Sequence, residues 1–299
     1  MKRASNIVVI LLAVVLSVSL IGCGKSGKEK AKKGAKSTKE EFKMPDSLLT
    51  PIASYNLVRD DYHPIKGGVM ANEEIELQYP ASNIARYIAV KTFGLARDGL
   101  NLVKEKIGPP ADGRVVLIGA KDLDEYKLLT RKEWWYYGVI KGDTIYFEPF
   151  DIMIKRSIAK VSIAQKLAQM ALIHKSKGRI PIWMREAIAS YVAGEGDILK
   201  MQANEFRYDN MNLNISPDEI KSALTKAVNR ADTRIAFYAA YRMLGKLLEF
   251  STMDHVVEFV DYLGQGLDMD KASKKAFGMD YNALIDRIRV DREAGAGKK

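Results

Sequence analysis

The chain has 299 residues, with 47 Lys and Arg against 37 Asp and Glu, and a formal net charge of +10. Most of this excess lies near the N-terminus: residues 1–22 hold two basic and no acidic residues, and residues 24–43 hold eight Lys and three Glu, which leaves only +3 for residues 44–299. So small an excess of positive charge in residues 44–299 does not predict nucleic-acid binding. The chain has a single cysteine, which excludes an intramolecular disulfide.

Residues 1–22 have the layout of a secretory signal peptide. Two basic residues precede a largely apolar run over residues 7–20, which is too short to span a bilayer comfortably. The run ends in L-I-G-C at Cys23, and this ending resembles a bacterial lipobox, in which the cysteine is lipidated and becomes the new N-terminus. We therefore expect Cys23 to carry acyl chains that tether the protein to a membrane face. The alternative is an ordinary cysteine that follows a transmembrane anchor.

Residues 23–45 are expected to form a disordered tether behind the lipidated cysteine. The stretch is rich in Lys, Gly and Ser and has little apolar content, so it cannot bury a core. It acts either as a solvated spacer or as a basic segment attracted to anionic lipids. The remaining residues, 46–299, are enough for one sizeable domain with two packed lobes. We place these lobes at 46–150 and 151–293, with a tail at 294–299.

The first lobe is predicted to mix strands and helices. Arg114–Ile118 is rich in β-branched residues, as expected of a strand covered on both faces. Alternating residues on either side of Lys141-Gly142-Asp143 predict a hairpin. The elements expected in chain order are a strand at Glu76–Tyr79, a helix capped by Ser82 that runs to about Lys106, a strand at Arg114–Ile118, a helix at Leu123–Leu129, and hairpin strands at Trp134–Ile140 and Thr144–Phe147.

The second lobe is predicted to be almost entirely helical from residue 152 onward. Its expected helices span about residues 153–176, 181–193, 216–229, 231–250, 252–264 and 280–292. A small mixed lobe followed by a helical lobe gives an α+β fold and predicts a cleft between the two lobes.

The helix predicted at 153–176 carries three polar residues among apolar neighbours. Gln165 and Gln169 are four positions apart and therefore lie on one face, with Lys166 beside them. The rest of this helix is apolar almost all round, which predicts that it is buried. A buried polar group without a partner costs about 1–3 kcal/mol, so these side chains are expected to have partners. The next helix supplies a carboxylate at Glu186.

This stretch resembles the gluzincin metallopeptidases, specifically the compact peptidase MA-like group that is often found in bacterial envelope proteins. The pattern of that group is H-E-x-x-H on one helix and, after a short gap, P-x-W-x-x-E-x-x-A on the next. The first half reads Q-K-L-A-Q in this chain, whereas the second half is matched by Pro181, Trp183, Glu186 and Ala189. Further likeness lies at Tyr238 and in the closing A-S-K-K-A-F-G-M-D-Y-N-A-L, so the resemblance spans about residues 70–292.

The resemblance implies a degenerate site, because the residues that define the chemistry are replaced. In an active member, two histidines and a glutamate hold Zn²⁺, and the motif glutamate is the general base. Only Glu186, the third ligand, is kept. Glutamine is a poor zinc ligand, and a protonated Lys166 repels a dication and cannot take a proton from water. We therefore expect no catalytic residue, no metal and no cofactor, with Lys166 paired to Glu186. The three histidines, His63, His174 and His255, are not placed to rebuild the site.

These observations predict a lipid-anchored protein of the cell envelope, in the outer membrane or on the outer face of the cell membrane, whose cleft binds a peptide or an envelope protein without cutting it. In gluzincins the substrate lies along an edge strand, and the resemblance implies that the hairpin from Trp134 to Phe147 supplies that edge. The expected cleft residues are Trp183, Tyr238, Trp135 and Tyr137, although the hairpin aromatics are equally suited to a core. Two alternatives remain: an active zinc peptidase with non-standard ligands, and an assembly lipoprotein that uses surfaces outside the cleft.

Overall fold

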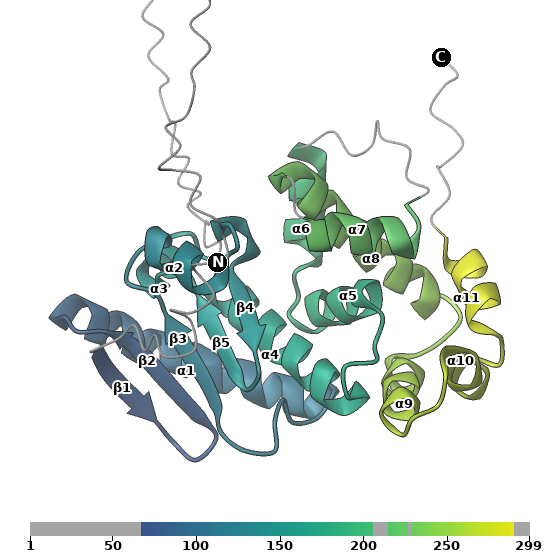
Figure 1. Ribbon diagram of the computed structural model, residues 1–299, viewed down its shortest axis with the longest axis horizontal. Coiled ribbons are helices and arrows are strands. Elements are labelled where there is room, and N and C mark those ends of the chain that lie inside the picture. The colour runs from purple at the N-terminus through teal and green to yellow at the C-terminus, as the bar shows by residue number, and fades with distance from the viewer. Residues whose placement is uncertain (1–66, 206–214, 227–228, 290–299) are drawn as a thin grey trace, which may run out of the picture. The chain divides into compact units, whose positions relative to one another are not determined.

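A computed structural model describes residues 67–205, 215–226 and 229–289, all within one compact unit that spans Tyr55–Lys299 (Figure 1). A small sheet forms in the N-terminal part of this unit, and helices make up nearly all of the rest. The α+β fold class predicted from the sequence is confirmed. The predicted signal peptide, Cys23 and the tether lie outside the described residues.

In the described part of the chain, five strands form one mixed sheet. Its order is β1-β2-β3-β5-β4, with β3 between two parallel neighbours and an antiparallel strand at each edge. The strands are β1 (Gly67–Ala71), β2 (Ile75–Pro80), β3 (Val115–Gly119), β4 (Gly138–Lys141) and β5 (Thr144–Phe147). The hairpin formed by β4 and β5 therefore places β4 at an edge of the sheet, beside the helices that follow in the chain.

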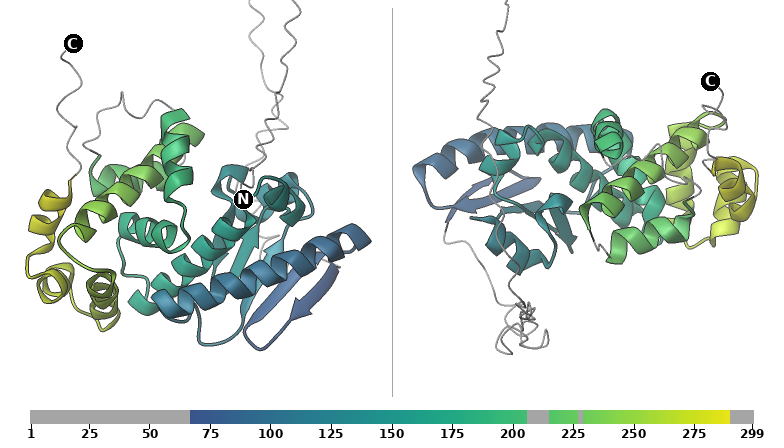
Figure 2. Two further views of the ribbon diagram at one scale, coloured as in Figure 1. Left: turned by 180° about the vertical axis from the view of Figure 1, so that it is seen from behind. Right: turned by 90° about the horizontal axis from the view of Figure 1, so that it is seen from above.

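Two long helices, α1 (Asn83–Lys106) and α4 (Ala159–Ser176), cover one face of the sheet (Figure 2, left). Helix α1 begins where the Ser82 hydroxyl accepts a hydrogen bond from the amide of Ala85 at 3.0 Å, as its sequence predicts. The inward-facing residues of β2, β3 and β5 alternate with outward-facing ones and are buried against these helices. On the other side of β5, Tyr146 packs against α2 (Leu123–Thr130).

The remaining helices build the second lobe around α4 and α5. Helix α5 packs between α4 and α8, while α6 and α7 pack on α8, and α9 packs on α4 (Figure 1). Their bounds are α3 (Phe150–Lys155), α5 (Ile182–Val192), α6 (Gly196–Glu205), α7 (Pro217–Lys226), α8 (Arg230–Leu248), α9 (Met253–Gly264), α10 (Met269–Phe277) and α11 (Tyr281–Ile288). One contiguous apolar core runs from the sheet through α4 and α5 to the last helices.

Within the described ranges, no helix is both long enough and apolar enough to cross a lipid bilayer.

The first hairpin strand is shorter than predicted. Trp134–Tyr136 form a 3₁₀ helix, Tyr137 adopts a left-handed conformation with φ 60°, and β4 begins only at Gly138. The prediction of a strand from Trp134 was therefore wrong. The aromatic residues suit a strand by propensity, but tertiary contacts from α8, described below, fix the turn instead.

The helix predicted at 153–176 is two helices, α3 and α4. Ser157 has φ 58°, and the amide of Ile158 donates to the carbonyl of Met153, as in a Schellman motif. A serine at this position gives a weaker stop signal than glycine does, which explains why the break was not predicted. Two further elements, β1 and α6, were also missed because they are short.

Candidate functional site

The polar residues of α4 face α5 in two layers. The Gln165 amide donates to the Ser190 hydroxyl at 3.1 Å, and the Gln169 amide donates to Glu186 Oε2 at 2.5 Å. The later glutamine of α4, Gln169, pairs with the earlier residue of α5, Glu186, and the earlier glutamine pairs with the later residue, Ser190. The helices are therefore antiparallel, and one turn separates the two polar layers.

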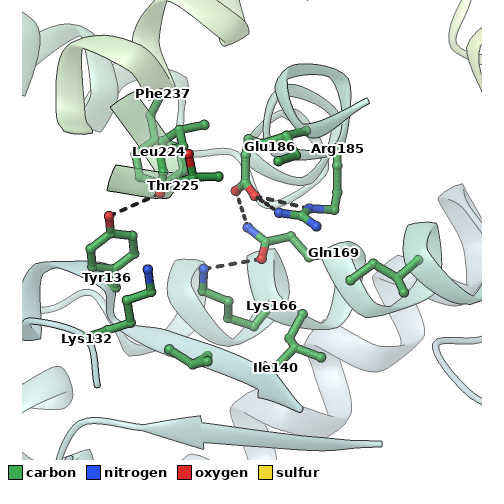
Figure 3. A pocket seen from close by; sticks show the side chains of 14 residues that line it. Lys132, Tyr136, Ile140, Lys166, Gln169, Arg185, Glu186, Leu224, Thr225 and Phe237 are labelled. Carbon is green, nitrogen blue, oxygen red and sulfur yellow. Dashed lines mark hydrogen bonds and ion pairs between the residues drawn. The ribbon is translucent and has the colours of Figure 1, made fainter. Parts of the chain in front are cut away.

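Lys166 is buried in the layer that contains Glu186. Its side chain is 4% exposed, and its Nζ donates to Gln169 Oε1 at 3.3 Å. Burial lowers the pKa of this amine, and the nearby carboxylates of Glu186 and Glu195 oppose that shift. Among the ion pairs of the described residues, none joins Lys166 directly to Glu186, so the direct pair predicted from the sequence was wrong. The Gln169 side chain lies between the two charges and bridges them (Figure 3).

Glu186 is neutralised by its neighbour in sequence. Arg185 donates to Glu186 Oε1 from Nε at 3.1 Å and from Nη2 at 2.7 Å, while Gln169 occupies Oε2 (Figure 3). Both oxygens of this buried carboxylate are therefore engaged by donors. Arg185 was not predicted as a site residue, although it directly precedes Glu186 in the sequence.

A second buried charge cluster lies one turn along α4. Glu195 accepts hydrogen bonds from Gln165 at 2.9 Å and from Ser190 at 2.7 Å, and it lies 3.8 Å from Arg234 of α8. Burial raises the pKa of the Glu195 carboxyl, and Arg234 opposes this. This pair was not predicted from the sequence. A signal was present, because Arg234 in T-R-I-A-F is a charged residue among apolar residues of a predicted helix.

Arg234 ties this cluster to the 3₁₀ helix beside the sheet. Its side chain is 1% exposed, its Nη2 donates to the Trp135 carbonyl at 2.5 Å, and its guanidinium lies 4.2 Å from the centre of the Tyr137 ring. These contacts join α8 to residues about 100 positions earlier in the chain. They also account for the turn at Trp134–Tyr136, because the Trp135 carbonyl is held toward α8 and cannot pair within a strand.

A pocket of about 300 Å³ lies where β4, α4, α5, α7 and α8 meet (Figure 3). Three of the four sequence-predicted site positions line it, namely Lys166, Gln169 and Glu186, whereas Gln165 belongs to the deeper layer. The complete lining is Lys132, Tyr136, Gly138, Val139, Ile140, Lys166, Gln169, Ile173, Ile182, Arg185, Glu186, Leu224, Thr225 and Phe237. The lining mixes an apolar floor from β4, α4 and α5 with a group of charged side chains.

The aromatic residues expected in the cleft are not part of this pocket lining. Trp183 is 1% exposed, and its indole donates to the Tyr281 hydroxyl at 2.9 Å. Tyr137 is buried and accepts a hydrogen bond from Gln202 at 3.4 Å, while Trp135 and Tyr238 are partly buried elsewhere. The hairpin aromatic that does line the pocket is Tyr136, because the 3₁₀ helix rotates it there.

The donor atoms at these positions do not suit a zinc ion. Among the described residues, no three His, Cys, Asp or Glu side chains are grouped closely enough to hold a metal. Glu186, the carboxylate expected from the resemblance, is engaged through both oxygens, and the amine of Lys166 faces the same space. His174 pairs with Asp112 at 3.2 Å, and His255 contacts Ser251, so neither faces the pocket. His63 lies outside the described residues, and the absence of metal stays a prediction.

No protein-family model matches the chain, and no match was found among curated proteins. The resemblance to gluzincins therefore depends on the P-x-W-x-x-E-x-x-A half of the motif and on the order of the elements, and it stays an expectation.

Proposed function

We propose that this chain is a lipid-anchored protein of the cell envelope whose degenerate metallopeptidase-like domain binds an extended peptide segment beside β4 and does not cleave it. The observation that carries the proposal is the position of the pocket. An edge strand, the polar residues of the buried helix α4, and Glu186 meet around one cavity of about 300 Å³. That size falls at the lower end for ligand pockets and suits one or two side chains.

The edge position of β4 supports an extended ligand. The strand pairs only with β5 among the strands described, so no described strand occupies its other edge, and we propose that the ligand adds there. Val139 and Ile140 of this strand, with Ile173 and Ile182 opposite, give the pocket an apolar wall. Strand addition of this kind takes affinity from backbone hydrogen bonds and specificity from side-chain pockets.

We expect binding without cleavage because the one carboxylate among the described residues that line the pocket, Glu186, is already hydrogen-bonded. In the metallopeptidase mechanism, peptide hydrolysis needs a water that is bound to the metal and activated by a free carboxylate base. The Glu186 carboxylate is engaged by Arg185 and Gln169, and Lys166 takes the position that the general base has in the resembling family. The described pocket lining therefore offers recognition groups and lacks the free carboxylate base that this mechanism uses.

The peptide site can be tested on the full chain in detergent micelles with labelled Ile, Leu and Val methyl groups. We would titrate a pooled library of N-acetylated hexapeptides and recover the peptides for mass spectrometry. The proposal predicts shift changes at Val139, Ile140 and Ile173, unchanged signals at Val256 and Leu284 in the distant core, and intact peptides. Changes confined to outer helical surfaces would instead favour an assembly protein, and zinc-dependent cleavage would make the chain a peptidase.

The membrane half of the proposal has its own test. Replacing Cys23→Ser removes the acceptor thiol, so the protein is expected to leave the membrane fraction or to accumulate unprocessed. Mass spectrometry of the N-terminal peptide of the native protein should show an acylated Cys23. An unmodified N-terminus with residues 1–22 retained would contradict lipid anchoring.

A further inference from the structure

Two lysine side chains converge on the pocket from different elements. Lys132 follows α2, is half-buried, and holds its Nζ 5.0 Å from the centre of the Tyr136 ring. Lys166 comes from the buried face of α4. Figure 3 shows both nitrogens directed toward the same space, between Tyr136 on one side and Gln169 on the other.

Neither lysine has a carboxylate within ion-pair distance among the residues that the structure describes. Glu186 is the only carboxylate in the pocket lining, and Arg185 and Gln169 already engage it. The lining thus carries three basic side chains and one acidic one. Lys166 Nζ has three donor hydrogens, and the weak hydrogen bond to Gln169 uses one of them.

The Lys166 side chain passes close to the backbone of β4. A Cβ added at Gly138 would lie 3.1 Å from Lys166 Cγ and 3.0 Å from the Phe147 ring, so the glycine permits a close approach of strand and helix. The stem of the Lys166 side chain therefore lies directly beside β4, the strand to which we propose that the ligand adds.

The C-terminal end of α7 disfavours an anion in the pocket. The last residues of α7, Leu224 and Thr225, line one side, and the C-terminal end of a helix carries partial negative charge. The Tyr136 hydroxyl donates to the Leu224 carbonyl at 3.3 Å and so satisfies one of these groups. The amines of Lys132 and Lys166 face this partial charge, and a bound carboxylate would supply the counter-ion that the protonated form of a buried amine otherwise lacks.

We propose that Lys132 and Lys166 bind a carboxylate of the ligand, so that the pocket selects an extended segment bearing a carboxylate beside β4. The carboxylate belongs either to the C-terminus of the segment or to an acidic side chain. This inference rests on the proposed function, because it names the chemical class of the ligand in the same pocket.

The test compares matched peptides on the full chain in detergent micelles. Each N-acetylated hexapeptide from the pooled library would be offered with a free C-terminal carboxylate, as the C-terminal amide, and as the amide with one internal Asp. We expect a carboxylate form to bind about tenfold more tightly than the plain amide, the size of a charge-assisted hydrogen bond. Preference for the free C-terminus or for internal Asp identifies the source of the carboxylate.

Three variants assign the effect to the two lysines. Lys132→Met and Lys166→Met should each remove most of the preference for the carboxylate form, whereas Lys160→Met, an exposed lysine of the same helix α4, should keep it. Thermal unfolding of each variant identifies loss of fold, and the half-buried Lys132 gives a usable variant if Lys166→Met fails to fold. Equal affinity for amide and carboxylate, or a preference that survives both lysine changes, would overturn the inference.

Acetate and acetamide separate this inference from the proposed function. If no peptide binds but acetate shifts the Val139 and Ile173 methyl signals in a lysine-dependent way, the carboxylate site stands and the peptide-binding function fails. If peptides bind without regard to charge, the function stands and this inference fails. If neither peptide nor acetate changes these signals, both are overturned.

Discussion

At the scale of single residues, Gln169 has the central role in the pocket layer. Its amide group accepts from Lys166 and donates to Glu186, so it connects two buried charges that do not touch. A planar amide that donates at one end and accepts at the other is suited to this position. The sequence predicted that these side chains would need partners, but not which side chain would stand between the charges, because that depends on the distance between α4 and α5.

Replacing Gln169→Leu is expected to lower the free energy of unfolding by about 1–3 kcal/mol, because Glu186 Oε2 and Lys166 Nζ would each lose a hydrogen bond in a buried layer. Urea denaturation at neutral pH measures the change. The matched control is Gln265→Leu, at an exposed glutamine after α9, which should stay within about 0.5 kcal/mol of the wild type. A Gln169 variant as stable as this control would contradict the bridging role.

Glu148 gives a prediction for pH. Its side chain is fully buried after β5, one oxygen accepts from Arg156 at 3.1 Å, and the other has no hydrogen-bond partner among the described residues. Burial raises the pKa of this carboxyl from its ordinary 4.5 to about 7, against the opposing effects of Arg156 and Arg234. The folded state therefore keeps a proton that the unfolded state loses between these two values.

The contribution of Glu148 to stability is thus greatest below about pH 4.5 and falls as the pH rises toward 7, with a slope of up to about 1.4 kcal/mol per pH unit. Glu148→Gln should remove this part of the slope, and comparing the two proteins cancels the titration of other groups. The measurement is urea unfolding at several pH values from 4.5 to 8. Parallel stability curves for the two proteins would show that Glu148 does not titrate in this window.

At the scale of elements, the Glu195–Arg234 pair connects α5 and α8 to the 3₁₀ helix before β4. Breaking a buried ion pair by removing one partner costs about 3–5 kcal/mol, because the other charge stays buried. Arg234→Met should therefore destabilise the fold strongly, and adding Glu195→Gln should recover part of the loss. A double-mutant cycle from urea unfolding measures the coupling. Additive effects of the two changes would mean that the pair does not act as a unit.

The helices and strands that were predicted correctly have strong local signals. Helix α1 has a serine cap and a periodic apolar face, and α4 is apolar almost throughout. The wrong predictions lie where a distant contact decides the conformation. Trp134–Tyr136 have strand propensity, yet Arg234 draws the Trp135 carbonyl toward α8, and no pattern within the hairpin reveals a contact about 100 residues away.

At the scale of the whole molecule, the order of a sheet lobe followed by a helical lobe was predictable because it depends on periodicity summed over long segments. The site was predictable in part: Lys166, Gln169 and Glu186 meet at one pocket, as their spacing on neighbouring helices indicated. The contributions of Lys132, Tyr136 and Arg185 to the pocket could not be predicted, because they depend on how the turn before β4 and the start of α5 face the pocket.

We propose that the positions which resemble a metal site form an internally bonded polar layer beside a binding pocket. Zinc content tests it most directly. The full chain would be purified without chelator, offered Zn²⁺, dialysed, and measured by elemental analysis beside Glu186→Ala. Near-zero zinc in both proteins is the result that the bonding of Glu186 to Arg185 and Gln169 predicts. One tightly held zinc per wild-type chain, lost in Glu186→Ala, would contradict it and point to a peptidase with unusual ligands.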